Sequence, residues 1–166
     1  MIVVSDSSPL NYLALIGEER LLPILFEKIV IPRAVFEELN HPAAPPEIRG
    51  LIDPLPPWLQ VHQLDLATPL VDVDRLDPGE AEAIRIALHL RADLILIDEW
   101  LGRQAAEGHG LKVVGTIGIL ERAIRAGLAD GPTLVTRLKS TSFRASPRLL
   151  ALLEETRPSQ AKSRPK

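Results

Sequence analysis

Two short aliphatic runs, each followed at once by an aspartate, most constrain how this chain can fold. Residues 2–5 (IVVS) precede Asp6, and residues 94–97 (LILI) precede Asp98. Runs of this kind are typical of interior strands of a parallel sheet that is covered by helices on both faces. Because ligands of open α/β sheets bind beyond the carboxyl ends of the strands, we expect the two carboxylates to meet in one crevice.

The rest of the chain alternates between strand and helix patterns, which predicts right-handed βαβ units. We therefore expect an α/β protein with three α/β/α layers and a mostly parallel central sheet. Further strands are predicted over residues 28–31, 58–64 (an edge strand) and 112–114. Helices are predicted over residues 9–16, 18–26, 32–40, 78–90, 100–107, 117–126, 133–139 and 147–155. Six prolines between residues 41 and 57 predict an irregular segment with one helical turn at 47–52.

Length and composition predict a single globular domain over residues 1–156. The chain has 166 residues, of which 46% are apolar, and no cysteine, which excludes disulfides, thiolate zinc sites and cysteine nucleophiles. We find neither a signal-peptide pattern nor an apolar run of membrane-spanning length. We therefore expect a cytoplasmic protein with no membrane partner.

The last ten residues, 157–166, carry four basic side chains and no acid, although the net charge of the chain is −3. Their content of proline and serine predicts a disordered tail, and a weak phosphate contact is the second interpretation.

Helix geometry separates two neighbouring glutamates in the 32–40 helix. Successive residues are about 100° apart, so Val35 and Leu39 share a face and Glu38 lies at its margin. Glu37 points away from that face and is expected in solvent. Glu38 is therefore the carboxylate expected to approach the protein body.

The same geometry separates Glu80 from Glu82 in the next helix. Glu80 lies near the middle of the apolar stripe, whereas Glu82 falls on the opposite side. A carboxylate centred on an apolar face needs a partner, since burial of an unpaired charge is costly. Asp77 as N-cap with Glu80 at N3 makes a capping box one explanation, and a position beside a metal is another.

The two aspartates likewise have two interpretations each. Asp6, before Ser7, Ser8 and Pro9, suits a helix N-cap or an Asx turn as well as a metal ligand. Asp98 repeats this pattern, and Glu99 beside it is either a further ligand or an acid that favours the start of the next helix. Arg85 and Arg103 are surface cations or groups that neutralise such a pocket or contact phosphate.

Taken together, four acids lie at strand ends or on inward helix edges: Asp6, Glu38, Glu80 and Asp98. Such a cluster would repel itself without a cation, and ligands that are all oxygen suit Mg²⁺ or Mn²⁺. The arrangement suits in-line attack of a metal-activated water on a phosphodiester. The four histidines show no metal-ligand spacing, and neither a phosphate-binding loop nor a serine nucleophile elbow is present.

The same residues resemble the ordered motifs of PIN-domain nucleases, and in particular VapC-like toxins of toxin–antitoxin pairs. The similar segments are residues 4–10 (VSDSSPL), 31–39 (IPRAVFEEL), 76–84 (LDPGEAEAI) and 96–99 (LIDE). The eighteen-residue separation of Glu80 and Asp98 is also similar. Two residues depart from the pattern, because Glu80 replaces the more frequent Asp and Ile97 stands where relatives have Thr or Ser.

The resemblance implies a PIN-like fold and an Mg²⁺- or Mn²⁺-dependent endoribonuclease that acts on single-stranded RNA. Asp6, Glu38, Glu80 and Asp98 would hold the metal, and Ser7 would help to position Asp6 or a water. It also implies the toxin of a type II toxin–antitoxin system, a homodimer, and a small antitoxin protein that blocks the acidic site.

Two other functions compete with this interpretation. The first is a catalytically inactive PIN-like module that binds protein and keeps the acidic pocket for structural reasons. The second is a receiver-type phosphoacceptor, which needs a lysine near the end of a late strand. Lys112 precedes its strand instead, so the receiver interpretation is disfavoured.

Overall fold

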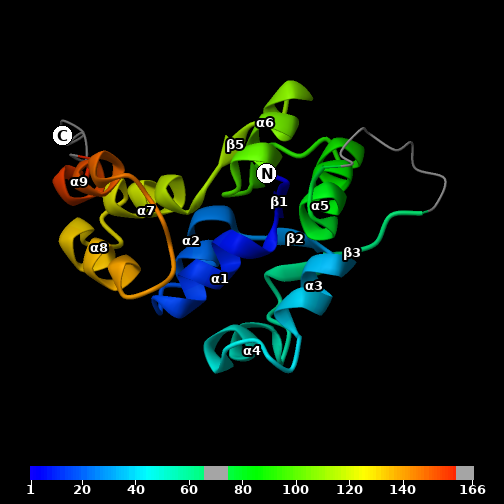
Figure 1. Ribbon diagram of the computed structural model, residues 1–166, viewed down its shortest axis with the longest axis horizontal. Coiled ribbons are helices and arrows are strands. Elements are labelled where there is room, and N and C mark those ends of the chain that lie inside the picture. The colour runs from blue at the N-terminus through cyan, green and yellow to red at the C-terminus, as the bar shows by residue number, and fades with distance from the viewer. Residues whose placement is uncertain (66–74, 160–166) are drawn as a thin grey trace, which may run out of the picture. The chain divides into compact units, whose positions relative to one another are not determined.

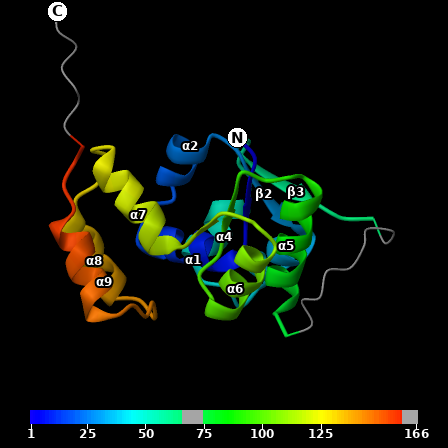
Figure 2. The ribbon, with the colours of Figure 1, turned by 90° about the horizontal axis from the view of Figure 1, so that it is seen from above.

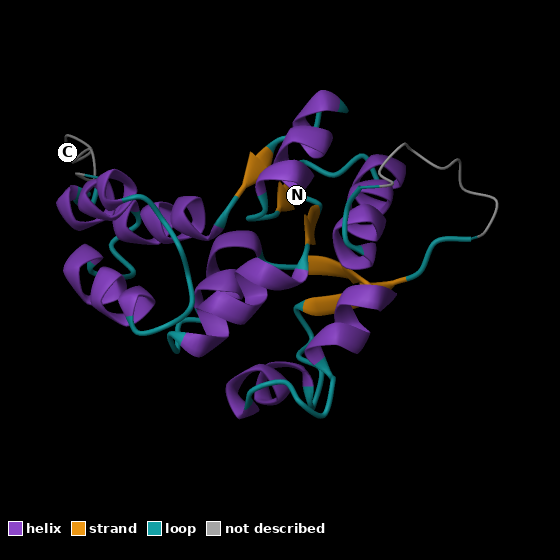
Figure 3. Ribbon diagram, viewed as in Figure 1, coloured by secondary structure: helices purple, strands orange, loops and turns teal. Residues whose placement is uncertain are grey.

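The computed structural model describes residues 1–65 and 75–159. The chain divides into two compact units, Met1–Thr116 and Ile117–Lys166. Within the described ranges, the strands all belong to the first unit, where Figure 3 draws them in orange. None of the helices in these ranges is long and apolar enough to cross a membrane.

The first unit is built on a five-stranded parallel sheet in the order β3-β2-β1-β4-β5 (Figure 1). The strands are β1 (Val3–Ser5), β2 (Ile29–Pro32), β3 (Leu59–His62), β4 (Leu94–Leu96) and β5 (Val113–Val114). Every neighbouring pair is parallel, and β3 is an edge strand. The predicted α/β class and parallel sheet are confirmed.

Helices on both faces complete the three-layer architecture. In the first unit they are α1 (Ser7–Leu15), α2 (Leu21–Phe26), α3 (Arg33–Leu39), α4 (Pro46–Ile52), α5 (Pro78–His89) and α6 (Trp100–Gly108). Two predicted helix starts in this unit are wrong by two or three residues. α1 begins two residues early because Asp6 caps it. α2 begins three residues late because Gly17, at φ +70°, and the bond from Glu18 N to Leu13 O first turn the chain.

One face of the sheet packs against α5 and α6. Val4 pairs in register with Val30 and with Ile95, so these side chains point to the same face. The apolar stripe of α5, including Ile84 and Ala87, is fully buried in a cluster with Val4 and Ile95. This packing holds α5 against β1, β2 and β4, and Figure 2 shows α5 beside β2.

The strand order reverses between β1 and β4, which are neighbours at the middle of the sheet. From β1 the chain proceeds through β2 to β3 on one side, and from β4 it proceeds to β5 on the other. Ser5 pairs with Leu96, and the backbone N–H of Asp6 donates to Leu96 O at 2.9 Å. The carboxyl ends of these two strands therefore flank the topological switch point, where open α/β sheets bind ligands.

The second unit contains α7 (Thr116–Arg125), which starts at the unit boundary, α8 (Gly131–Lys139) and α9 (Pro147–Glu155). α8 and α9 lie side by side (Figures 1 and 2). Of the predicted tail, residues 157–159 are described, and Ser159 N donates to Arg125 O at 2.8 Å. The remainder, 160–166, lies outside the described residues.

Candidate active site

Asp6 lies at the start of α1, with only 3% of its surface exposed. Its carboxylate caps the helix by accepting a hydrogen bond from Ser8 N at 3.5 Å. Burial raises the pKa of Asp6 to about 6, against the hydrogen bonds from the Ser7 and Ser8 backbone. The charges of Glu38 and Asp98 raise it further. The capping interpretation is thus correct, and two of the predicted acids also act on the pKa of this carboxyl.

Glu38 faces this carboxyl from α3. The Ser7 hydroxyl donates to Glu38 Oε1 at 3.1 Å. Glu37 and Glu38 are both exposed, but Glu37 pairs with Arg33 at 2.9 Å and not with Ser7. The structure therefore places Ser7 between β1 and α3, with its side chain on Glu38 and its backbone on Asp6.

Glu80 is the acid whose environment is most unusual. It is 6% exposed, and its Oε1 is buried with no hydrogen-bond partner among the described residues. Burial raises its pKa to about 7, the charge of Asp6 adds to the rise, and a hydrogen bond from the Asp77 backbone opposes it. The Asp77 side chain makes no capping bond. Of the predicted capping box, the bond from the Asp77 backbone to Glu80 is formed and the bond from the Asp77 side chain is not. The capping box therefore gives no partner for Glu80 Oε1.

Glu82, on the other side of α5, has a partner that the sequence did not reveal. It is half-buried, and its Oε2 accepts a hydrogen bond from Ala34 N at 3.1 Å. Ala34 is in the first turn of α3, whose N-cap position is Pro32 and has no side-chain cap. Glu82 therefore serves as the cap of α3, the helix that carries Glu38.

Asp98 follows β4 and is held by Thr116, a residue that sequence reasoning missed. Thr116 N and Oγ1 both donate to its carboxylate, at 2.7 and 2.6 Å. Burial raises the pKa of Asp98, whereas these bonds and the Arg103 charge oppose the rise. Its position just after β5, the strand next to β4, is the sequence signal that could have found it. Ile97 stands where relatives have Thr or Ser and carries no hydroxyl, whereas the Thr116 hydroxyl reaches Asp98.

Arg103 is the cation beside these acids. Its Nη1 donates to Ile97 O at 3.3 Å, and its charge lowers the pKa of Asp98. Arg85 differs, because its Nε is buried with no hydrogen-bond partner in the described part of the chain. Glu99 is exposed at the N-cap of α6, and its charge raises the pKa values of Glu80 and Asp98.

Two glycines let the elements approach closely around the carboxylates. A Cβ on Gly79 would lie 3.4 Å from Asp6 Oδ1 and 3.6 Å from Glu38 Oε2, so both oxygens border one point. A Cβ on Gly102 would collide with the Ile97 side chain and lie 3.1 Å from Glu80 Oε1. Side chains at either position would push α5 or α6 away from the acids.

The donor set, which consists of oxygen ligands, fits a hard divalent cation. In the described ranges, no three Asp, Glu or His side chains converge closely enough to hold a metal ion. The carboxylates are nevertheless coupled through Asp6, and Glu80 Oε1 lacks a donor. A cation with oxygen ligands would satisfy that atom and remove the repulsion.

Comparisons with known proteins decide the family. A family model described as DUF3368, PIN domain, matches residues 2–156. This chain belongs to the PIN-domain family. Its fold is also similar, at a TM-score of 0.48 and 17% identity, to a PilT N-terminus domain protein from the hyperthermophilic archaeon Sulfolobus solfataricus P2, over 87% of this chain and 100% of that one. No curated protein matches the chain.

PIN domains are generally nucleases that depend on divalent metals and act on RNA or DNA, so membership supports a nuclease-like role.

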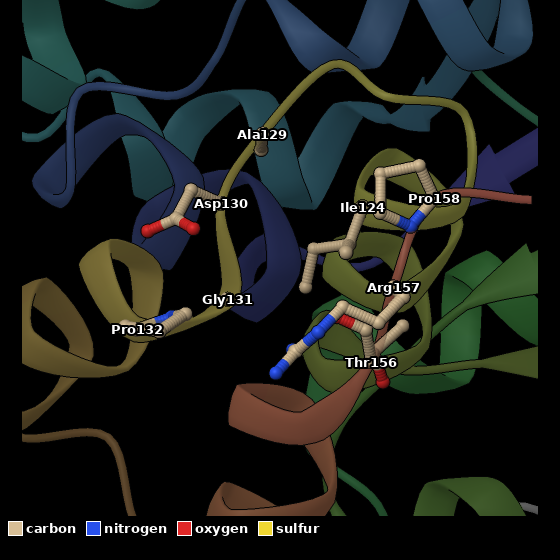
Figure 4. Close-up of a pocket in the computed structure, with 8 residues that line it drawn as sticks. All are labelled: Ile124, Ala129, Asp130, Gly131, Pro132, Thr156, Arg157 and Pro158. Atoms are coloured by element: carbon tan, nitrogen blue, oxygen red, sulfur yellow. The ribbon is translucent and has the colours of Figure 1, made fainter.

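A hollow in the second unit does not compete with the carboxylates as a catalytic site. It has a volume of about 220 Å³ and is lined by Ile124, Ala129, Asp130, Gly131, Pro132, Thr156, Arg157 and Pro158 (Figure 4). Asp130 caps Thr133, and Arg157 donates to Glu154 O and Thr156 O, so its charged groups serve local structure.

The buried carboxyls predict an unusual pH dependence of stability in the metal-free protein. A raised native pKa means that the folded state holds its proton more tightly than the unfolded state does. Stability is therefore full below the ordinary pKa of Asp6, 3.8, and is lost as pH rises from there to about 6; for Glu80 the loss extends from 4.5 to about 7. The loss for Asp6 alone is roughly 3 kcal/mol.

Chemical denaturation in EDTA at pH 5 and pH 8 measures this effect. Asp6→Asn removes the titrating group, so the variant should exceed the parent in stability at pH 8 and approach it at pH 5. Glu37→Gln, which alters an exposed pair, is the control and should follow the parent. If the parent has a larger free energy of unfolding at pH 8 than Asp6→Asn, the raised pKa of Asp6 is wrong.

Proposed function

We propose that this PIN-domain protein is a metal-dependent endoribonuclease whose metal is held by Asp6, Glu38, Glu80 and Asp98. The observation that carries the proposal is the buried, unpartnered Glu80 Oε1 within a set of coupled carboxylates at the switch point of the sheet. A structural role alone would leave this oxygen costly and unsatisfied.

The ion that suits these ligands is Mg²⁺ or Mn²⁺, because every donor is an oxygen. When bound, it would supply an activated water for in-line attack on a phosphodiester and would offset the charge of the acids. The chain's own residues hold the geometry. Thr116 orients Asp98 and Ser7 orients Glu38. Glu82 anchors the start of the helix that presents Glu38.

The proposed reaction also requires positive charge near the carboxylates. A phosphodiester that approaches four carboxylates is repelled unless positive charge is near. Arg103 supplies such charge beside Asp98, on the first turn of α6 after its N-cap at Glu99. The site therefore contains acids for a cation and a guanidinium for the phosphate.

The biological role that we propose is that of a VapC-like toxin of a type II toxin–antitoxin pair. RNA is then the substrate, a small antitoxin protein covers the acidic site, and the active form is a cytoplasmic homodimer. The ordered motifs support this role, and the match over residues 2–156 supports one PIN-like domain over 1–156. The alternative is an inactive PIN-like binding module, which would keep the fold without the chemistry.

The central prediction concerns the two strand-end aspartates. Asp6→Asn and Asp98→Asn should each lower cleavage of single-stranded RNA at least about 100-fold, since each removes a metal-binding charge. Cleavage by the parent should require Mg²⁺ or Mn²⁺ and stop with EDTA. Gel assays measure cleavage, and circular dichroism verifies the fold. An active Asp98→Asn enzyme would overturn the site, and a folded parent without metal-dependent cleavage would favour the inactive module.

A second prediction separates the two acids of α5. Glu80→Gln should reduce activity strongly and weaken binding of Mn²⁺, because it removes a buried carboxylate charge that is coupled to Asp6. Glu82→Gln should be nearly silent, because its amide oxygen still accepts from Ala34 N. Titration of Mn²⁺ by isothermal calorimetry, alongside RNA cleavage, reads both effects. The reverse ranking would contradict the assignment of Glu80.

The toxin role predicts a growth effect in cells. Induced expression of the parent in a bacterial host should slow growth, whereas the Asp98→Asn variant should not. Growth curves with matched protein levels on immunoblots measure the difference. Equal growth of the two strains, with RNA cleavage by the purified parent, would retain the nuclease and reject the toxin.

A further inference from the structure

Trp100 is exposed beside the candidate active site, and neither the fold nor the metal-binding acids require it there. All six aromatic side chains of the chain lie in the described residues, and Trp100 is the one among them that is largely exposed, at 67%. It is the first residue of α6 and lies two positions after Asp98. Tryptophan side chains are highly buried on average, so this exposure is unusual for the residue type.

Trp100 also has a cation on its own side of the helix. Residues three apart on a helix are surface neighbours, which places Arg103 next to Trp100. Arg103 Nη1 donates to Ile97 O, close to Asp98, and the guanidinium has further N–H donors that suit a phosphate. An aromatic face and a cation side by side are the two elements with which proteins hold single strands.

The surroundings favour a nucleobase over a protein partner as the occupant. Leu101 is exposed at 51%, but successive helical residues point about 100° apart. Trp100 and Leu101 thus do not form one apolar face of the kind that buries a partner helix. Arg103 is the cation on the Trp100 side of the helix, and Asp98 lies two residues before Trp100 in the chain, so these surroundings suit a sugar–phosphate chain.

We propose that Trp100 stacks on a base of single-stranded RNA next to the cleaved phosphodiester, while Arg103 contacts a phosphate of the same strand. This proposal rests on the proposed ribonuclease function and assigns a base-binding residue for its single-stranded substrate. In a duplex the base faces are already stacked, so a duplex of the same sequence would lack this contact.

Binding is measured by fluorescence anisotropy with the full chain, a labelled unstructured RNA oligonucleotide and a duplex of the same sequence. Ca²⁺ replaces Mg²⁺, and gels verify that the RNA stays intact. Trp100→Ala should weaken single-strand binding about 10-fold, the change that ~1.4 kcal/mol of stacking gives. Trp100→Phe should retain most of the affinity, whereas Trp100→Leu should behave like Trp100→Ala. Arg103→Gln should weaken binding and flatten its salt dependence.

A direct readout comes from Trp58→Phe, which leaves Trp100 as the single tryptophan. Its fluorescence should be quenched by the single strand and much less by the duplex. Unchanged affinity in Trp100→Ala, full affinity in Trp100→Leu, or no quenching would each overturn the proposal. A change of self-association in Trp100→Ala with unchanged RNA affinity would identify a protein contact and overturn it as well.

The two proposals fail separately. If the parent cleaves RNA with Mg²⁺ but Trp100→Ala binds and cleaves like the parent, the stacking role is wrong and the ribonuclease stands. If stacking is measured and the parent never cleaves RNA, the ribonuclease is wrong and the single-strand surface stands.

Discussion

Repulsion among buried carboxylates is the constraint around which the first unit is organised. Parallel pairing of β1 with β4 brings the ends of both strands to one edge, and Asp6 and Asp98 follow them there. Burial raises the pKa of Asp6 to about 6 and that of Glu80 to about 7. The neighbouring contacts restrain these acids, with Thr116 on Asp98 and the α1 backbone on Asp6. At neutral pH a cation or a bound proton stabilises such an arrangement.

Local and functional roles coincide in the same side chains. Asp6 is a helix cap and a coupled member of the acid set, and Glu80 accepts from the Asp77 backbone with a second oxygen left over. The capping explanation and the metal explanation are therefore not alternatives. In Asp6 the cap uses Oδ2, while Oδ1 borders the same point as Glu38 Oε2.

Prediction from the sequence succeeded where one element decides the outcome. Helical periodicity correctly placed Glu37 in solvent and Glu80 on a buried face. It could not find the bond from Ala34 to Glu82, because that bond depends on how α3 packs against α5. Thr116 was missed for the same reason, since its contact with Asp98 joins two neighbouring strand ends. The roles of the four acids and of Ser7 in catalysis stay predictions.

The sequence by itself determined the strands, most helix boundaries and the family, because periodicity, caps and turn residues act within a few neighbouring positions. Only the tertiary structure decided that β1 and β4 are neighbours at the switch point, that Glu82 caps α3, and that Thr116 holds Asp98. These contacts join residues far apart in the chain. Their geometry follows from sheet order and helix packing, which no single segment encodes.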